Sequence, residues 1–337
     1  MRGARRGRIL TFNCHEPYIH LLAKVGLGLD VVDGLPGRAT RRWDTRQRPV
    51  PEGARLVRLE EARARGPYEA IIAHNVADLI DARSIDAPKV LMLHVSLTAR
   101  TLEEPGAPPA ANMRRELSSY LAAIGGVAVA VSAMKRDSWG LPARVIRPAV
   151  DPDEWGGHRG DRPALLRVAN DVLRRPARFD WPRHLEIVGG LPWELVGHNP
   201  GVPGAAPAAS WDDLRERYRS ARAYVHSSGE GLDDGYNLAV LEAMATGMPV
   251  VTTAGHESPV EDGVSGFCSD STATLRDGAA RLLADPALAR TLGDQARQRV
   301  ADLFPVAAFR EGWLETIAEA KARHAAAHAD RAAGLVT

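Results

Sequence analysis

Residues 234–251 read DGYNLAVLEAMATGMPVV, which is the pattern of a loop, a buried helix and the first residues of a strand. The apolar positions of the helix recur at helical spacing, at Leu238, Leu241, Met244 and Ala245. Gly247 accepts the left-handed conformation that ends a helix, and Pro249 opens the next strand. Glu242 stands in the middle of the apolar helix, where a carboxylate is unexpected unless it faces a cleft.

The loop before this helix offers a place for an anion. Backbone N–H groups in the first turn of a helix have no partner within the helix, and the helix dipole adds positive potential there. The loop residues concerned are Gly235, Tyr236 and Asn237. We therefore expect a phosphate or a similar anion to bind at this position.

Short apolar runs alternate with helical segments along the rest of the chain. Continuous apolar runs, such as residues 127–131, are typical of strands buried on both faces of a parallel sheet. We expect strands at residues 8–12, 29–32, 55–59, 68–73, 89–95, 127–132, 143–148, 165–169, 193–197, 223–227, 248–253 and 265–269. We expect helices at residues 110–124, 177–188, 211–221, 236–246, 273–284, 286–303 and 306–320. The sequence therefore predicts an α/β fold of two doubly wound parallel-sheet units.

The chain length and one biased segment indicate where the domains divide. The 337 residues suggest two domains, at roughly 150 residues per domain. Proline, glycine and charged residues crowd together in residues 151–163, which we interpret as a linker. The expected domains are residues 1–150 and 164–320, followed by an Ala-rich tail at residues 321–337.

Charge and cysteine content exclude several classes of protein. Lys and Arg number 43 and Asp and Glu 42, so the net charge of +1 lacks the basic excess of a dedicated nucleic-acid binder. Cys14 and Cys268 are too few for a disulfide scaffold and fit a reducing compartment. The apolar run behind the basic start ends at Phe12, whereas a secretory signal needs about 7–15 apolar residues. We expect a cytoplasmic protein with at most peripheral membrane contact.

The spacing of two carboxylates connects this pattern with a known family. Asp234 and Glu242 stand before and within a helix that continues as LEAMATGMPVV, and this resembles the donor-site motif of retaining glycosyltransferases of family 4. That family has the GT-B fold, in which two Rossmann-like domains face each other across a cleft. The resemblance implies that Asp234 lies beside the transferred sugar and that Glu242 holds the ribose hydroxyls of the nucleotide. It implies no metal or other cofactor.

Other segments resemble family landmarks in the expected order. The stretch 68–74 resembles a strand that ends in histidine, and 90–94 resembles the next strand, whose final residue here is His94. In the family this histidine approaches the donor sugar, so the resemblance assigns a catalytic role to His94 together with Asp234. The stretches 129–132 and 145–151 resemble the two strands before the linker.

The phosphate-binding positions depart from the family pattern. The family has an Arg and a Lys after the first strand of its second domain, whereas this chain has Asn170 and Arg175 at those places. Arginine binds phosphate in a bidentate manner, so Arg175 or its neighbour Arg174 can take this role. The alternative is that both arginines are solvated surface residues.

Two carboxylate positions also differ from the family. Asp234 replaces a Glu, and Glu230 upstream is the alternative if the loop carries an insertion, although the spacing to the helix favours Asp234. A further family carboxylate is expected in the loop after the Pro-Val-Val run, where this chain has Ser258, with Glu257 one place away. This substitution leaves the identity of the donor sugar open.

The loop after the first strand lacks a glycine-rich turn. It contains His15 and Glu16, which are candidates for acceptor recognition or proton handling, with a buried, hydrogen-bonded histidine as the alternative. The absence of a G-x-G-x-x-G pattern here argues against a nicotinamide oxidoreductase. His324 and His328 have a zinc-capable spacing, but no third ligand stands near them in the sequence, which favours an ordinary tail helix.

The expected function is transfer of a sugar from a nucleotide-diphosphate sugar to an unknown acceptor (a glycan, a lipid or a small molecule). The resemblance implies a hexosyl-type, retaining, metal-independent enzyme, and cell-surface polysaccharide or glycoconjugate synthesis is the expected setting. One alternative is a GT-B-fold epimerase or phosphorylase. Another is a non-catalytic nucleotide-sugar-binding homologue, which the substitutions at Asn170, Asp234 and Ser258 keep open.

Overall fold

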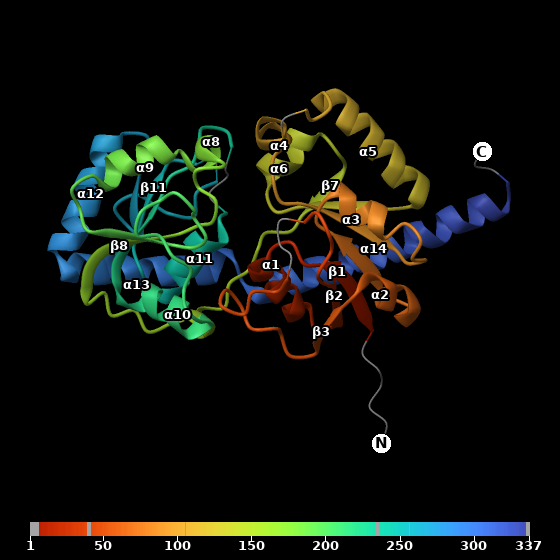
Figure 1. Cartoon of the computed structure of the whole chain (residues 1–337), viewed down its shortest axis with the longest axis horizontal. Coiled ribbons are helices and arrows are strands. Elements are labelled where there is room, and N and C mark those ends of the chain that lie inside the picture. Colours follow the sequence, from red (N-terminus) through yellow and green to blue (C-terminus); the bar gives the residue numbers. More distant parts are fainter. Residues whose placement is uncertain (1–6, 39–41, 105, 233–235, 256, 335–337) are drawn as a thin grey trace, which may run out of the picture. The chain divides into compact units, whose positions relative to one another are not determined.

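The computed structural model describes residues 7–38, 42–104, 106–232, 236–255 and 257–334. The chain forms two compact units, residues 1–148 with 307–337 and residues 149–306, each built on one parallel sheet with helices on both faces (Figure 1). This confirms the predicted α/β fold class. Within the described residues, no helix is both long and apolar enough to cross a bilayer.

The first unit contains a seven-stranded parallel sheet in the order β3-β2-β1-β4-β5-β6-β7. Its strands are β1 (Arg8–Phe12), β2 (Gly28–Val32), β3 (Ala54–Val57), β4 (Ala70–Ala73), β5 (Lys89–Leu93), β6 (Val127–Ala130) and β7 (Ala143–Val145). The chain passes from β1 to one side and then returns to place β4 on the other side, so the strand order reverses between β1 and β4. Doubly wound sheets bind ligands at the carboxyl ends of the strands beside such a reversal.

Helices cover both faces of this sheet. They are α1 (Glu16–Leu22), the short 3-10 helix η1 (Ala23–Val25), α2 (Leu59–Arg65), α3 (Val76–Asp81), α4 (Leu97–Glu103), α5 (Ala110–Ile124), α6 (Ala133–Trp139) and α14 (Val306–Ala332). Trp139 of α6 and Leu117 and Leu121 of α5 share one apolar cluster with β5 and β6. Tyr18 of α1 instead meets Phe309 of α14, with ring centroids 6.2 Å apart.

The second unit contains a five-stranded parallel sheet in the order β12-β11-β10-β8-β9. Its strands are β8 (Arg162–Val168), β9 (Trp193–Val196), β10 (Ala221–His226), β11 (Val250–Thr253) and β12 (Gly266–Ser269). Here the order reverses between β8 and β10. The loops that follow these two strands therefore flank the position at which this fold class binds ligands.

The helices of the second unit pack on its sheet in two groups. They are α7 (Pro152–Trp155), α8 (Pro176–Phe179), α9 (Trp181–Val188), α10 (Trp211–Ser220), α11 (Leu238–Thr246), α12 (Thr272–Ala284) and α13 (Pro286–Leu303). Ile187 of α9 and Leu275 of α12 belong to one apolar cluster, whereas Tyr218 of α10 and Met244 of α11 belong to another, and Figure 1 shows these pairs of helices on opposite faces of the sheet.

The helix predicted at residues 177–188 is interrupted in the structure. Asp180 takes a left-handed conformation with φ of 39° and separates α8 from α9. Pro182 lacks the backbone N–H that a continuous helix would donate to the carbonyl of Arg178. The chain therefore ends one helix and starts another at this point.

The last helix belongs to the first unit, whereas the sequence analysis placed residues up to 320 in the second domain and residues 321–337 in a tail. The helix was predicted at residues 306–320, where Phe309, Trp313 and Ile317 recur at helical spacing, but such an apolar stripe does not reveal which domain it covers. In the structure these residues are buried, and Gly312 lies against Ile146 of the first unit. The helix also continues to Ala332, well into the Ala-rich segment.

Gly293 is the point at which α13 crosses the end of α11, and its replacement is expected to destabilise the second unit. A Cβ at Gly293 would lie 2.0 Å from the carbonyl oxygen of Gly247. Gly293→Ala should therefore lower the free energy of unfolding by about 2–4 kcal/mol. Alanine otherwise stabilises a helix by about 1 kcal/mol relative to glycine, so the sign of the effect is diagnostic. Urea unfolding followed by tryptophan fluorescence measures it.

Gly312 in α14 provides the matched control for this prediction. A Cβ there meets Ile146 at 3.4 Å, an ordinary van der Waals distance. Gly312→Ala should leave stability unchanged or raise it by up to about 1 kcal/mol. Equal stability of Gly293→Ala and the wild type would contradict the close crossing of α11 and α13.

Candidate functional site

The loop after β8 carries three of the predicted donor-binding residues. Asn170 uses its Oδ1 to accept the backbone N–H of His198 at 2.7 Å, which joins this loop to the loop after β9. Arg175 donates to the carbonyl oxygen of Asn170 at 3.0 Å, and its guanidinium lies 5.1 Å from the ring centroid of Phe179. Arg174 beside it is exposed. The structure thus places Asn170 in a bracing role and two arginines at the carboxyl edge of the sheet.

The first turn of α11 lies on the other side of the strand-order reversal. Asn237 is the N-cap, and its Oδ1 accepts the backbone N–H of Ala239 at 2.9 Å. Tyr236 is buried, and its ring meets Phe304 edge-on with centroids 5.2 Å apart. Asp234 and Gly235 lie outside the described residues. The described part of this loop therefore contributes the N-cap of α11 and the Tyr236 ring that packs the loop against Phe304.

Glu242 is buried in the middle of α11, with 6% of its surface exposed. The hydroxyl of Tyr218 on α10 donates to its Oε2 at 3.2 Å. Tyr224 on β10 is close enough that the charge of Glu242 adds to the burial that raises the pKa of that phenol. Two tyrosines therefore surround a carboxylate that the sequence predicts to face a ligand.

The loop after β11 contains the position at which a family carboxylate is expected. Ser258 accepts the backbone N–H of Val260 at 3.2 Å, so its hydroxyl shapes the loop. Glu257 beside it is half-buried, and its Oε2 is buried with no hydrogen-bond partner among the described residues. Glu230, the alternative to Asp234, is exposed. Buried polar atoms normally have partners, so Glu257 stands out here.

Sequence reasoning missed a buried arginine behind this edge. Arg167 on β8 is 1% exposed and donates to the Ser227 hydroxyl at 2.8 Å and to the carbonyl oxygens of Ser227 and Phe179, each at 3.1 Å. It therefore ties the start of the loop after β10 to the end of α8. The signal for it is an arginine inside the otherwise apolar run of residues 164–168.

The loop after β1 places His15 and Glu16 at the carboxyl edge of the first sheet. His15 is exposed and precedes α1, whereas Glu16 is 3% exposed. Glu16 accepts the backbone N–H of Asp44 at 3.2 Å and lies 3.4 Å from the amide nitrogen of Asn13. Burial raises the pKa of Glu16. Glu16 thus holds a loop, and His15 is the residue of the two that reaches the surface.

A chain of hydrogen bonds connects β1, β4 and β5 at the same edge. The Thr11 hydroxyl donates to the carbonyl oxygen of Ile72 at 2.9 Å and lies 2.7 Å from Nε2 of His74. The Nδ1 of His74 lies 2.8 Å from the Nε2 of His94. The ring of Tyr18 packs edge-on against His94 with centroids 4.6 Å apart.

This chain determines which ring nitrogens carry protons. The Thr11 hydroxyl proton goes to a carbonyl that can only accept, so Nε2 of His74 must donate to Thr11. The Nδ1 of neutral His74 then accepts from Nε2–H of His94. Consequently Nδ1 of His94 keeps its lone pair and can accept a hydrogen bond from a ligand hydroxyl.

Both imidazoles are neutral at physiological pH. Burial, then the charge of His15, lowers the pKa of His74 to about 3. Burial, then the charges of His74, His15 and Lys135, holds the pKa of His94 well below its ordinary value. The sulfur of Cys14 and one ring nitrogen of each histidine all lie within 4.8 Å of one another.

His74→Gln is expected to reduce the acid sensitivity of the fold. Between pH 6.5 and about 3, the unfolded chain binds a proton on His74 that the folded chain does not. Stability therefore falls as the pH falls, by about 1.4 kcal/mol per pH unit for this group. Glutamine carries no titrating proton, so the slope of unfolding free energy against pH should decrease by about that amount below pH 6.5.

Urea unfolding at several pH values below neutrality measures both slopes. His198→Ala is the control, because this exposed histidine lies in the second unit. Its slope should equal that of the wild type. A His74→Gln slope that also equals the wild-type slope would show that His74 is not held neutral.

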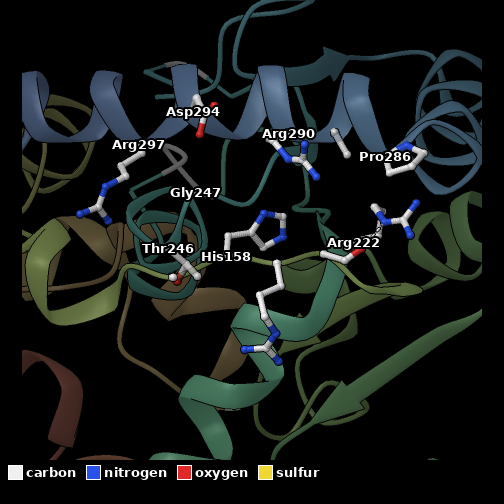
Figure 2. Close-up of a pocket in the computed structure, with 12 residues that line it drawn as sticks. His158, Arg222, Thr246, Gly247, Pro286, Arg290, Asp294 and Arg297 are labelled. Carbon is white, nitrogen blue, oxygen red and sulfur yellow. Dashed lines mark hydrogen bonds between the residues drawn. The ribbon is translucent and has the colours of Figure 1, made fainter.

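A separate pocket of about 240 Å³ lies in the second unit (Figure 2). Arg290 and Asp294 reach it from α13, and His158 lies on its other side (Figure 2). Arg222, at the start of β10, and Gly247, at the end of α11, also line it. It therefore lies at the amino end of β10, away from the carboxyl edge that carries the candidate site.

Part of the second unit matches a known protein family. Residues 206–299 match the family model described as Glycosyl transferases group 1, and this span contains β10, α11 and β11. The comparison with curated proteins finds no match.

Solved structures share the fold of the chain. HepE from Anabaena, in complex with UDP and glucose, has a TM-score of 0.66 at 14% identity over 93% of this chain and 99% of its own. Sucrose-phosphate synthase from Thermosynechococcus elongatus has a TM-score of 0.63 at 16% identity over 92% and 98%. TarM has a TM-score of 0.57 at 15% identity over 74% of this chain and 54% of its own, so this chain spans about half the length of TarM. The comparisons confirm the GT-B fold class.

Proposed function

We propose that the chain is a glycosyltransferase that moves a hexosyl group from a nucleoside-diphosphate sugar to an acceptor, with retention at the anomeric carbon and without a metal ion. The observation that carries the proposal is the position of α11. The helix lies within the segment that matches Glycosyl transferases group 1, and it follows β10 beside the reversal of strand order. Doubly wound folds bind their ligands at such a position.

The second unit would hold the nucleotide. Glu242 would accept hydrogen bonds from the ribose hydroxyls, with Tyr218 keeping the carboxylate in place from α10. Arg174 and Arg175 would contact the diphosphate, together with the N-terminus of α11. The two arginines and the helix N-terminus matter most when the bond between the sugar and the diphosphate breaks, because the diphosphate gains negative charge in the transition state.

In the first unit, His94 would accept a hydrogen bond from a hydroxyl of the transferred sugar. Its lone pair at Nδ1 and its neutral charge suit this role, and His74 and Thr11 are positioning residues behind it. In the reaction the bond between C1 and the phosphate oxygen breaks, and the acceptor oxygen bonds to C1. The acceptor proton passes to the leaving diphosphate, so no general base is assigned.

One observation favours a particular nucleotide in the donor, and another favours a particular carboxylate as the residue that contacts the sugar. HepE and TarM were solved in complexes that contain UDP, which supports UDP as the first nucleotide to test. The Oε2 of Glu257 is buried and has no hydrogen-bond partner among the described residues, which supports Glu257 as the carboxylate that contacts the sugar, in place of Ser258. An unpaired buried carboxylate oxygen is costly unless a ligand supplies its partner.

The test is a turnover assay with UDP-glucose and a panel of glycan, lipid and small-molecule acceptors. The expected result is UDP release that depends on one acceptor class, with retained configuration at C1 in the product by NMR. An inverted product would contradict the retaining assignment. An epimerised sugar without transfer would identify an epimerase instead.

A pair of variants tests which carboxylate of the loop before α11 contacts the sugar. Asp234→Asn is expected to slow turnover at least tenfold, because the charge beside the developing positive sugar is lost. Glu230→Gln removes an exposed carboxylate four residues upstream and should retain near-wild-type turnover. The reverse result would transfer the role to Glu230.

A further inference from the structure

Two histidines and an aspartate converge in the first unit, outside the candidate site. His324 and His328 are one turn apart on α14, so their side chains lie on the same face of the helix. Asp86 belongs to the turn before β5. Its Oδ1 lies 3.2 Å from Nε2 of His324 and 3.1 Å from Nε2 of His328. The structure therefore supplies the third ligand that the sequence around the two histidines lacks.

The separations match those around a tetrahedral metal ion. Zinc bonds to imidazole nitrogen and carboxylate oxygen are about 2.0–2.2 Å long, which places two ligands of a tetrahedral site about 3.3 Å apart. All three ligand atoms lie within 4.8 Å of one another. The two imidazole rings are in contact, with centroids 4.3 Å apart, so both can face one ion.

The helix that carries the histidines is held in place on the first unit. Gly125, at the end of α5, lies directly against the backbone of α14: a Cβ there would come within 2.4 Å of the carbonyl oxygen of Arg323. Lys321, one turn before His324, forms an ion pair with Glu69. The segment that carries the two histidines is therefore held against the first unit before His324, through Lys321 and Arg323, and between the two histidines, through Ala327.

We propose that Asp86, His324 and His328 form a binding site for one divalent transition-metal ion, with zinc as the best fit, which clamps the end of α14 to the turn before β5. Two imidazoles and one carboxylate form a donor set that suits zinc, with water in the fourth position. The ion would take the place of the hydrogen bonds that Asp86 now receives.

The charges around the cluster are compatible with a cation. Lys89 stands three residues after Asp86, and its ammonium donates to the carbonyl oxygens of Ile85 and Ala87, at 3.0 and 3.3 Å.

The proposed role of the ion is to fasten the last turns of a long helix. Beyond His328 the helix continues to Ala332 through residues that are exposed. An ion that binds only the folded arrangement stabilises it by mass action. The clamp would therefore raise the thermal stability of the chain and protect the backbone amides of residues 321–332 from exchange.

The test uses the full chain, freed of metal with a chelator and titrated with zinc chloride by calorimetry. The Cys14→Ser variant serves as background, because Cys14, His74 and His94 form a second cluster of metal-ligating side chains. The expected result is one zinc ion per chain, a rise of a few degrees in Tm and slower amide exchange in residues 321–332.

Matched variants separate the site from nonspecific binding. His328→Ala and Asp86→Asn should each weaken zinc binding at least tenfold, because three ligands become two. Asp330→Asn and His198→Ala remove an exposed carboxylate and an exposed imidazole elsewhere and should bind zinc as the background does. Zinc binding that survives both ligand substitutions, or no binding with zinc in tenfold excess, would overturn the proposal.

Discussion

Glu242→Gln is expected to lower kcat/KM for the donor about 150-fold. A carboxylate that holds two ribose hydroxyls provides two charge-assisted hydrogen bonds, each worth about 1.5–3 kcal/mol. Glutamine retains one acceptor and presents an N–H₂ group on the other side, so a loss of about 3 kcal/mol is expected. The volume of the side chain stays the same, which matters because Glu242 is buried in α11. Steady-state kinetics with varied donor concentration measures the effect.

Tyr218→Phe is the matched control for this variant. It removes the hydroxyl that donates to Oε2 of Glu242 and leaves the carboxylate itself unchanged. We expect a loss of about 1 kcal/mol of stability and an effect on kcat/KM of less than tenfold. If Glu242→Gln reduced stability without reducing donor binding, Glu242 would be a structural residue bonded to Tyr218 and not a ribose ligand.

His94→Ala is expected to lower kcat about 100-fold while the affinity for the free nucleotide stays near the wild-type value. The proposed contact of His94 is with the transferred sugar, so its loss should appear in turnover and not in binding of the nucleotide alone. One strong hydrogen bond that is made in the transition state accounts for about 2.7 kcal/mol. Single-turnover kinetics together with calorimetry of nucleotide binding separates the two quantities.

Thr11→Val tests the positioning of His94 through its neighbours. Valine has nearly the shape of threonine but cannot accept from Nε2 of His74, so His74 is free to take the other tautomer. The Nε2 of His94 would then lose its acceptor and its fixed proton. We expect kcat to fall by about tenfold, with a shifted pH profile. An unchanged profile would show that the hydrogen-bond chain does not control His94.

The strands of both sheets could be predicted because a buried parallel strand is a continuous run of apolar residues in the sequence. Runs such as residues 127–131 are apolar throughout, and each predicted strand overlaps a strand of the structure. The helix at residues 177–188 was predicted without its break, although Pro182 inside that range is a signal for one: it stands in the first turn of α9, where a proline is favoured. The place of α14 was not predictable, because an apolar stripe indicates burial and not the surface that buries it.

The candidate site was only partly predictable for a related reason. The sequence singles out Glu242 because a carboxylate in an apolar helix is a local feature. The N-cap role of Asn237 was not predicted, since the helix was expected to start at residue 236 and begins at Leu238. The sequence does not reveal that Tyr218 bonds Glu242 or that Thr11 and His74 stand behind His94, because these contacts join distant strands and helices. The side-chain placement of Asp234 lies outside the described residues, and its role stays a prediction.

The most direct test of the account is a thermal-shift screen of the wild type and Glu242→Gln against UDP, GDP, ADP and dTDP and their sugars. A ligand at about 100 times its Kd adds about 2.7 kcal/mol to the stability of the folded chain. This corresponds to a rise of several degrees in Tm for a chain of this size. We expect such a rise with one nucleotide, of which UDP is the first to test, and we expect the rise to be lost in Glu242→Gln. No rise with any nucleotide would contradict a donor site at α11.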